Sequence, residues 1–277
     1  MSLFLHACSV LLPVVYLLLV LVYAMEFAGP RAPHPHKLRH AITGITLLLH
    51  AAWLWGHWTS VGHLPASDPW MLPTLIAFSL MAIYLPVEWM SGTPQTGSFV
   101  VGLAFILQLV SSVLVSETPI ISEHMTDAAF ALHVGMSILA LSALMLSGFY
   151  GWLYLLLLRQ MKRHVFGVLF QKLPNLDSLS HLNRGTATGG FILLTLGLNL
   201  AFAWAHSDET TEVNYVDPKI LVVLVTWIFF GLIAASRWIR MLSGRRAAIF
   251  ALAGLTLVFL TIIMASVPLG SLHGFAK

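Results

Sequence analysis

Three of the 13 histidines in this sequence stand apart because they lie in or beside apolar runs. His50 sits inside the apolar segment 47–53, and His133 lies within the apolar segment 131–136. His273 follows the last apolar stretch, in segment 268–274. A neutral imidazole nitrogen is a standard ligand of haem iron, and its partner nitrogen needs an acceptor that fixes the tautomer. Metal or haem ligation is therefore the chemistry that these residue types suggest.

The composition decides what kind of protein must position these side chains. Hydrophobic residues make up 58% of the 277 residues and charged residues only 9%, whereas a soluble domain carries about 25% charged residues. Lipid must therefore cover most of the surface. No basic stretch among polar residues is present, which excludes a nucleic-acid binder. The single cysteine, Cys8, excludes both an intramolecular disulfide and a CxxC haem-attachment motif, so the chain is not itself a c-type cytochrome.

The hydrophobic runs predict an all-α, polytopic membrane helix bundle that forms a single integral membrane domain over 1–277. A helix needs about 20 apolar residues to cross the hydrocarbon core. About eight segments qualify, and two prolines, Pro73 and Pro86, interrupt the third of them. The expected spans are 6–25, 41–58, 70–90, 98–116, 128–158, 186–205, 218–238 and 247–268.

The basic residues predict the orientation of these spans. Twelve of the 14 Lys and Arg residues fall in the three alternate loops 26–40, 159–185 and 237–246, and only Lys219 and Lys277 fall on the other side. Basic loops stay in the cytoplasm. Both termini are therefore expected on the outer, periplasmic side of a bacterial inner membrane, and His133 and His273 are expected there too.

Two imidazoles on one side of the membrane, at the ends of apolar helices, could supply both axial ligands of one haem iron. The alternative is that His133 and His273 are two unrelated interfacial histidines. His50 lies near the middle of the second span, where an ionisable residue is a functional-site candidate by default. It could instead be a core histidine that bonds a neighbouring helix. As a haem ligand, it would need a partner from another subunit or a ligand other than histidine.

The segment around His133, continuing through 137–143, resembles the haem-ligating helix start of the cytochrome c assembly proteins, a family with CcsA, CcmC and HemX groups. The segments 176–179 and 195–198 look like the element that precedes the family's signature loop. His273 is similar to the second external haem histidine of the CcsA group, and the span with His50 resembles an early HemX-type span. The resemblance covers most of the chain and is clearest over 128–277, the expected haem-handling core.

The family's tryptophan-rich "WWD" signature is present only in a degenerate form. Asp217-Pro218-Lys219, followed by Trp227, matches its end. In place of the preceding tryptophans this chain has residues 214–216, which include Tyr215. Aromatic faces in that loop should stack on the porphyrin, so the substitution favours the HemX-like branch, while the two outer histidines favour haem ligation.

The resemblance implies a protein that binds or presents haem b at the outer face of the membrane for attachment to apocytochrome c. His133 and His273 would be the iron ligands. Lys219 would pair with a propionate, and Asp217 would belong to the haem loop or simply cap a helix that begins at Pro218. The candidate cofactor-binding residues are His133, His273, His50, Asp217, Lys219, Tyr215 and Trp227.

The implied partners are haem, membrane lipid, apocytochrome c and another membrane protein of cytochrome c maturation, with no nucleic acid. The chain is not expected to be a stand-alone enzyme, although it could be a subunit of a cytochrome c haem lyase or synthase. The alternative is a HemX-type membrane scaffold or regulator of haem biosynthesis that does not ligate haem for transfer. A cytochrome b-like subunit is less consistent with the sequence, because no span carries two histidines at suitable depths.

Overall fold

The computed structural model describes residues 3–29, 36–62, 66, 69–114, 127–164, 166–207, 216–242 and 244–266. These residues form helices joined by short turns, with no strand among them, as the sequence predicts. The chain folds as two compact units, unit 1 (Met1–Thr126) and unit 2 (Asp127–Lys277). Unit 1 contains α1 (Leu3–Ala28), α2 (His36–Val61), η1 (Pro69–Met71), α3 (Leu72–Ser91), η2 (Pro94–Thr96) and α4 (Gly97–Leu114). Unit 2 contains α5 (Ala128–Lys162), α6 (Val168–Lys172), α7 (Leu176–Ser207), α8 (Pro218–Ala234), η4 (Ala235–Arg237), η5 (Arg240–Leu242) and α9 (Arg245–Ser266).

Seven helices in the described part of the chain are long and apolar enough to cross a membrane: α1, α3, α4, α5, α7, α8 and α9. Helix α2 has the same length as α1, 26 residues, but histidines and basic residues lower its apolar character. The prediction of about eight spans is therefore close, and the chain is a multi-pass membrane protein. The proline at 86 does not break the third span, because α3 continues through it.

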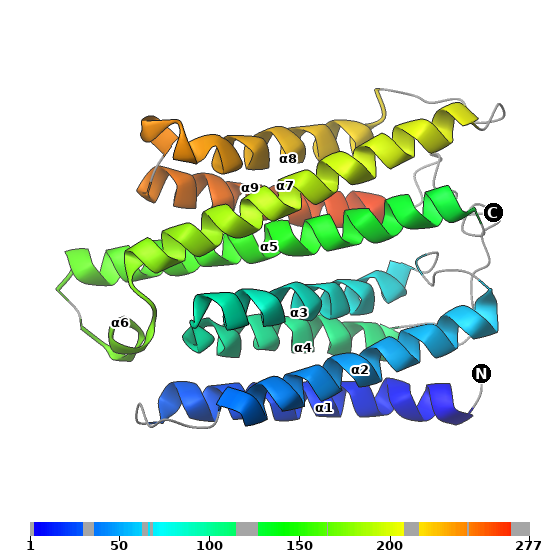
Figure 1. Ribbon diagram of the computed structural model, residues 1–277, viewed down its shortest axis with the longest axis horizontal. Coiled ribbons are helices and arrows are strands. Elements are labelled where there is room, and N and C mark those ends of the chain that lie inside the picture. Colours follow the sequence, from blue (N-terminus) through cyan, green and yellow to red (C-terminus); the bar gives the residue numbers. More distant parts are fainter. Residues whose placement is uncertain are drawn as a thin grey trace. The chain divides into compact units, whose positions relative to one another are not determined.

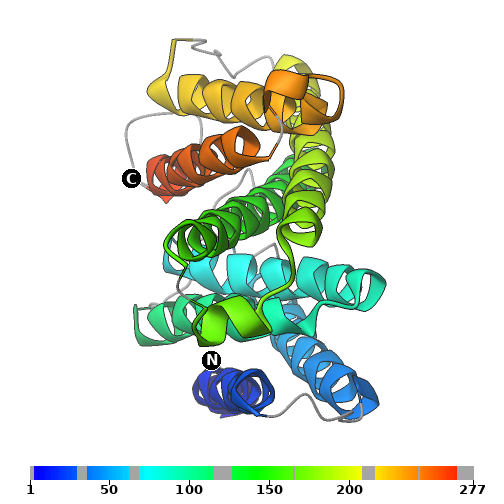
Figure 2. The same cartoon turned by 90° about the vertical axis from the view of Figure 1, so that its left-hand side faces the viewer.

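In unit 1, α1 packs against α2 and α4, and α3 packs against the same two helices (Figure 2). The core side of α1 carries Tyr16, Leu19 and Tyr23, each at most 1% exposed and spaced three or four residues apart. That spacing puts the three side chains on one face of the helix. The opposite face of α1 exposes apolar side chains such as Leu18, which suits contact with lipid.

Gly97 allows this packing at the start of α4. A Cβ atom at Gly97 would lie 2.1 Å from Cε1 of Tyr23 and 2.7 Å from the hydroxyl oxygen of Tyr84. Both tyrosine side chains are fully buried. The backbone of α4 can therefore approach α1 and α3 only without a side chain at this position.

We expect Gly97→Ala to lower the melting temperature of the detergent-solubilised protein, because overpacking a core costs about 1–3 kcal/mol. Gly102→Ala on the same helix is the matched control, since a Cβ there meets nothing within 4 Å. Equal melting temperatures for the two variants would contradict the packing at Gly97.

In unit 2, the 35-residue helix α5 packs against both α7 and α9, and α8 packs against α7 and α9. Successive long helices run in opposite directions, so the starts of α5 and α8 and the ends of α7 and α9 lie at one end of the unit (Figure 1). We call this the Asp127 end. Small residues let α5 and α9 approach closely: a Cβ at Gly151 would lie 2.9 Å from the Cβ of Ala251. Close backbone approach of this kind is how membrane helices gain packing energy.

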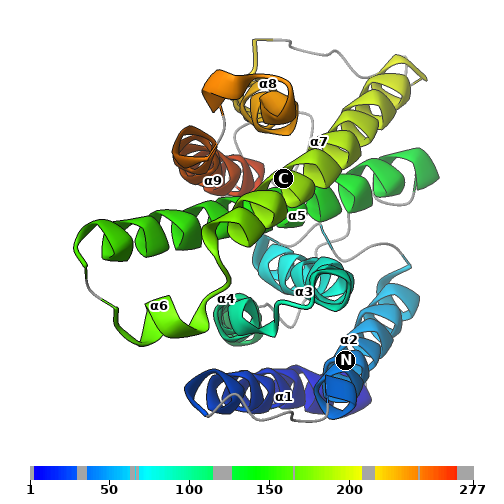
Figure 3. The same ribbon diagram turned by 60° about the vertical axis from the view of Figure 1, so that its left-hand side comes forward.

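The basic segment 159–185 is not the simple loop that was expected from the sequence. It contains the short helix α6 and the first turns of α7, which begins at Leu176, ten residues before the predicted start at 186 (Figure 3). The side chain of Asn175 accepts a hydrogen bond from the Ser178 amide at 2.8 Å. This bond satisfies one of the unpaired amides at the helix start.

Candidate functional site

His133 lies in the second turn of α5, at the Asp127 end of unit 2. Its Nδ1 is 2.8 Å from the carbonyl oxygen of Gly197 in α7. A carbonyl oxygen only accepts, so Nδ1 donates its proton and the ring's lone pair resides on Nε2. An imidazole that ligates a metal commonly has this arrangement, in which one nitrogen donates to a backbone carbonyl and the other faces the metal.

Two aromatic side chains lie beside His133 at the start of α5. Phe130 lies one turn before His133, with 6.1 Å between the ring centroids. Trp204 of α7 packs against Phe130, with centroids 4.7 Å apart, and is only 7% exposed. Phe130 was not among the residues predicted for the site. The i, i+3 spacing from His133 was the signal that could have found it.

The start of α8 provides two of the predicted site residues. Asp217 is the N-cap of α8, and its carboxylate accepts a hydrogen bond from the Lys219 amide at 2.9 Å. Pro218 occupies the first helical position, as predicted. Asp127 caps α5 in the same way, accepting from the amides of Ala129 and Phe130. Both helices therefore begin at the Asp127 end with their amide dipoles already capped.

Trp227 of α8 packs against α7 rather than beside His133. Its Nε1 donates to the hydroxyl of Thr195 at 2.8 Å, and its ring lies over Phe191 at 5.1 Å. Thr195 and Gly197 are two residues apart on one helix and face nearly opposite sides. His133 and Trp227 therefore contact opposite sides of α7.

Two predicted site residues, Tyr215 and His273, lie outside the described residues. Helix α9 is described to Ser266, seven positions before His273, and its end lies at the Asp127 end of unit 2. The pairing of His133 with His273 therefore stays a prediction.

His50 belongs to a buried chain of hydrogen bonds in unit 1. The hydroxyl of Thr74 donates to Oε1 of Gln108 at 2.6 Å, so its oxygen accepts from Nε2–H of His50 at 2.9 Å. Nδ1 of His50 then accepts from the hydroxyl of Tyr16 at 3.0 Å. All four side chains are 0% exposed. This network fixes one neutral tautomer and engages both ring nitrogens, so iron at His50 would have to displace Tyr16 or Thr74.

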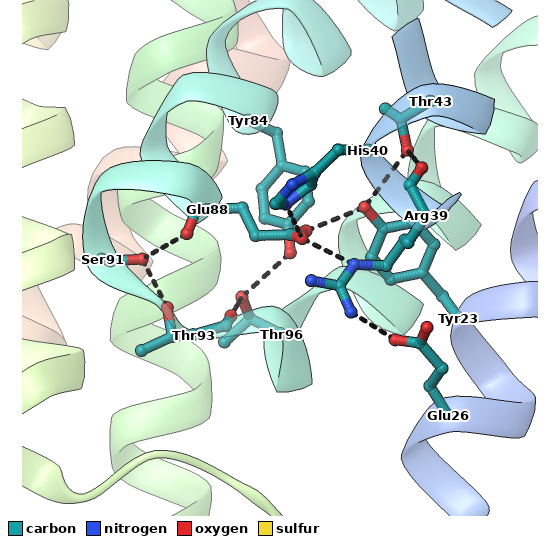
Figure 4. Close-up of polar contacts among 10 residues, drawn as sticks. All are labelled: Tyr23, Glu26, Arg39, His40, Thr43, Tyr84, Glu88, Ser91, Thr93 and Thr96. Carbon is teal, nitrogen blue, oxygen red and sulfur yellow. Dashed lines mark hydrogen bonds and ion pairs between the residues drawn. The ribbon is translucent and has the colours of Figure 1, made fainter. Parts of the chain in front are cut away.

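A second buried polar cluster in unit 1 was not anticipated from the sequence. Figure 4 shows Glu88 of α3 surrounded by donors from α1 and α2. Its carboxylate accepts from Nε of Arg39 and the hydroxyl of Tyr23, both at 2.8 Å, and lies 3.1 Å from Nε2 of His40. Arg39 also pairs with Glu26 of α1 at 2.5 Å. We call these five residues the Glu88 cluster.

The Glu88 cluster binds three helices together through charge. The side chains of Arg39 and Glu88 are 4% and 0% exposed, and such a pair is costly to bury unless every charge finds partners. The prediction that Arg39 lies in a loop was wrong, because the structure places it in the first turns of α2. A carboxylate inside the apolar run 70–90 was the signal available from the sequence.

Replacing Arg39 with Met leaves the buried carboxylate of Glu88 without its cation. We expect Arg39→Met to destabilise the protein by about 3–5 kcal/mol, measured as a lower melting temperature in detergent. Arg163→Met, at the exposed end of α5, is the control and should change stability by less than about 1 kcal/mol. If both variants have the same melting temperature as the wild type, the Glu88 cluster does not hold unit 1 together.

Known proteins resemble this chain over most of its length. The sequence model of the family described as "Cytochrome C assembly protein" matches residues 69–270. The chain is 24% identical to the cytochrome c biogenesis protein CcsA of Guillardia theta over 78% of this chain and 76% of that protein. It is 23% identical to CcsA of Porphyra purpurea over 87% and 88% of the two chains. A shorter match, to CcsA of Prochlorococcus marinus strain MIT 9303, reaches 32% identity over 37% of this chain and 32% of that protein.

Proposed function

This chain belongs to the cytochrome c assembly protein family, and from that premise we propose that it holds haem at the outer face of the membrane for cytochrome c maturation. His133 and His273 would be the two residues that hold the iron. The observation that carries this proposal is the hydrogen bond from Nδ1 of His133 to the carbonyl of Gly197. It leaves the lone pair on Nε2, the nitrogen that would ligate iron.

Other residues at the Asp127 end have the side-chain types that haem requires, aromatic rings for the porphyrin and a cation for a propionate. Phe130 and Trp204 form an aromatic pair beside His133, and Tyr215 would extend it from the loop. Among the described Lys and Arg residues of unit 2, Lys219 alone lies at this end, where it would pair with a propionate. Trp227 would contribute indirectly, by holding α8 against the side of α7 opposite to His133 through its hydrogen bond to Thr195.

Bound haem b would supply the vinyl groups to which the thiols of an apocytochrome are attached. The protein's own residues would bind and orient the haem: His133 and His273 would hold the iron, the aromatic side chains would align the ring, and Lys219 would pair with a propionate. The thiols come from the apocytochrome. We therefore expect the chain to work with apocytochrome c and a second maturation protein in a bacterial inner membrane, rather than as a stand-alone enzyme.

His50 is the candidate ligand of a second, intramembrane haem position. Its two hydrogen bonds, to Tyr16 and Thr74, would have to open to admit iron. Haem would therefore bind at His50 only transiently. The haem that copurifies with the protein would be bound at His133.

The test is the haem content of full-length protein purified from haem-replete cells, measured from its Soret band. We expect His133→Ala and His273→Ala to lose most of the band, because each removes an axial ligand, and His50→Ala to retain it. His181→Ala is the control, since that side chain is 67% exposed at the start of α7. Unchanged haem in the first two variants would contradict the proposal.

The HemX-type scaffold is the second candidate, favoured by residues 214–216, which replace the tryptophans of the signature. It predicts that even the wild type, purified at normal yield from haem-replete cells, carries no haem. The same purification therefore decides between the two functions.

A further inference from the structure

We propose that Gly197 is a positioning residue: the lack of a side chain there lets α7 approach α5 closely enough for the Gly197 carbonyl to set the tautomer and ligand strength of His133. This inference rests on the proposed function for its effect on iron. The hydrogen bond and the helix approach stand on the geometry alone.

The contact at Gly197 is tight at one atom of α5, the hydroxyl oxygen of Ser137. A Cβ atom there would lie 3.0 Å from Oγ of Ser137, 3.5 Å from the Ser137 amide nitrogen and 3.7 Å from Cβ of Met136. Ser137 lies one turn after His133 on α5, so both residues face α7. A Cβ atom at 197 would therefore crowd the Ser137 hydroxyl, and either that side chain or the turn of α5 that carries His133 would have to shift.

A second glycine fixes the same approach two turns away. A Cβ at Gly190 would lie 2.4 Å from Cδ2 of Leu144 and 3.1 Å from its amide nitrogen. Gly190 and Gly197 are seven residues apart on α7, and their contacts Leu144 and Ser137 are seven residues apart on α5. The two antiparallel helices are therefore held in one register along this stretch.

The carbonyl of Gly197 is the main acceptor for His133. The hydroxyl of Ser137 is 3.5 Å from the same Nδ1, against 2.8 Å for the carbonyl oxygen, and a contact of that length is weak. A close acceptor on Nδ1–H makes the opposite nitrogen a stronger electron donor. A stronger axial donor stabilises ferric iron, so lengthening this bond should raise the reduction potential of haem on His133.

The experiment compares Gly197→Ala, Ser137→Ala and the double variant in the full-length protein. Gly189→Ala is the matched control, because it adds the same methyl group to the same helix where a Cβ meets nothing within 4 Å. Redox titration of the copurified haem should show an upward shift for Gly197→Ala and none for Gly189→Ala. The double variant removes the obstructing hydroxyl and should return the potential toward that of the wild type.

Nitrogen NMR of the ¹⁵N-histidine-labelled protein without haem gives a second readout. The wild type and Gly189→Ala should show His133 protonated on Nδ1, whereas Gly197→Ala should show a mixture of the two tautomers. Two results would overturn the role of Gly197. One is a His133 ring that keeps the wild-type tautomer in the Gly197→Ala variant, and the other is a haem reduction potential in that variant equal to that of Gly189→Ala. Wild-type protein without haem would instead overturn the proposed function, while the NMR result would still decide on Gly197.

Discussion

The close approach of α5 and α7 is the constraint on which the organisation of unit 2 depends. In lipid no hydrophobic force drives one apolar helix onto another, so tight packing and hydrogen bonds must do it. Glycines at 190 and 197 let the two backbones meet, and the hydrogen bond from His133 crosses the gap. Helix α9 packs against another part of α5 through Gly148 and Gly151, so the helix that carries His133 is held by two neighbours.

Unit 1 is held together differently, by buried polar groups. The Glu88 cluster joins α1, α2 and α3, and the chain from Tyr16 through His50 and Thr74 to Gln108 joins α1, α2, α3 and α4. Helices α1 and α2 precede the part of the chain that matches the family, residues 69–270, whereas α3 and α4 belong to it. Buried donors and acceptors therefore fix these two helices against the family's own part of unit 1. Leaving any one of these buried groups without its partner would be costly.

Much of this architecture could be predicted from the sequence because the membrane imposes simple rules. Apolar length predicted the long helices, and the Asp217-Pro218 pair predicted the start of α8. Tertiary partners could not be predicted. Nothing local indicates that His133 meets a carbonyl 64 residues away, or that Trp227 contacts the side of α7 opposite to His133. Likewise, the burial of Arg39 depends on Glu88, which lies 49 residues later. The local sequence does not show this partner, so Arg39 was expected in a cytoplasmic loop.

Electron paramagnetic resonance of the full-length protein, purified with its haem and oxidised to the ferric state, reports whether His133 ligates the iron. Two imidazoles on one iron hold it in the low-spin state. We expect a low-spin spectrum for the wild type and high-spin iron in the residual haem of His133→Ala. The same low-spin spectrum in both proteins would mean that His133 does not ligate the iron.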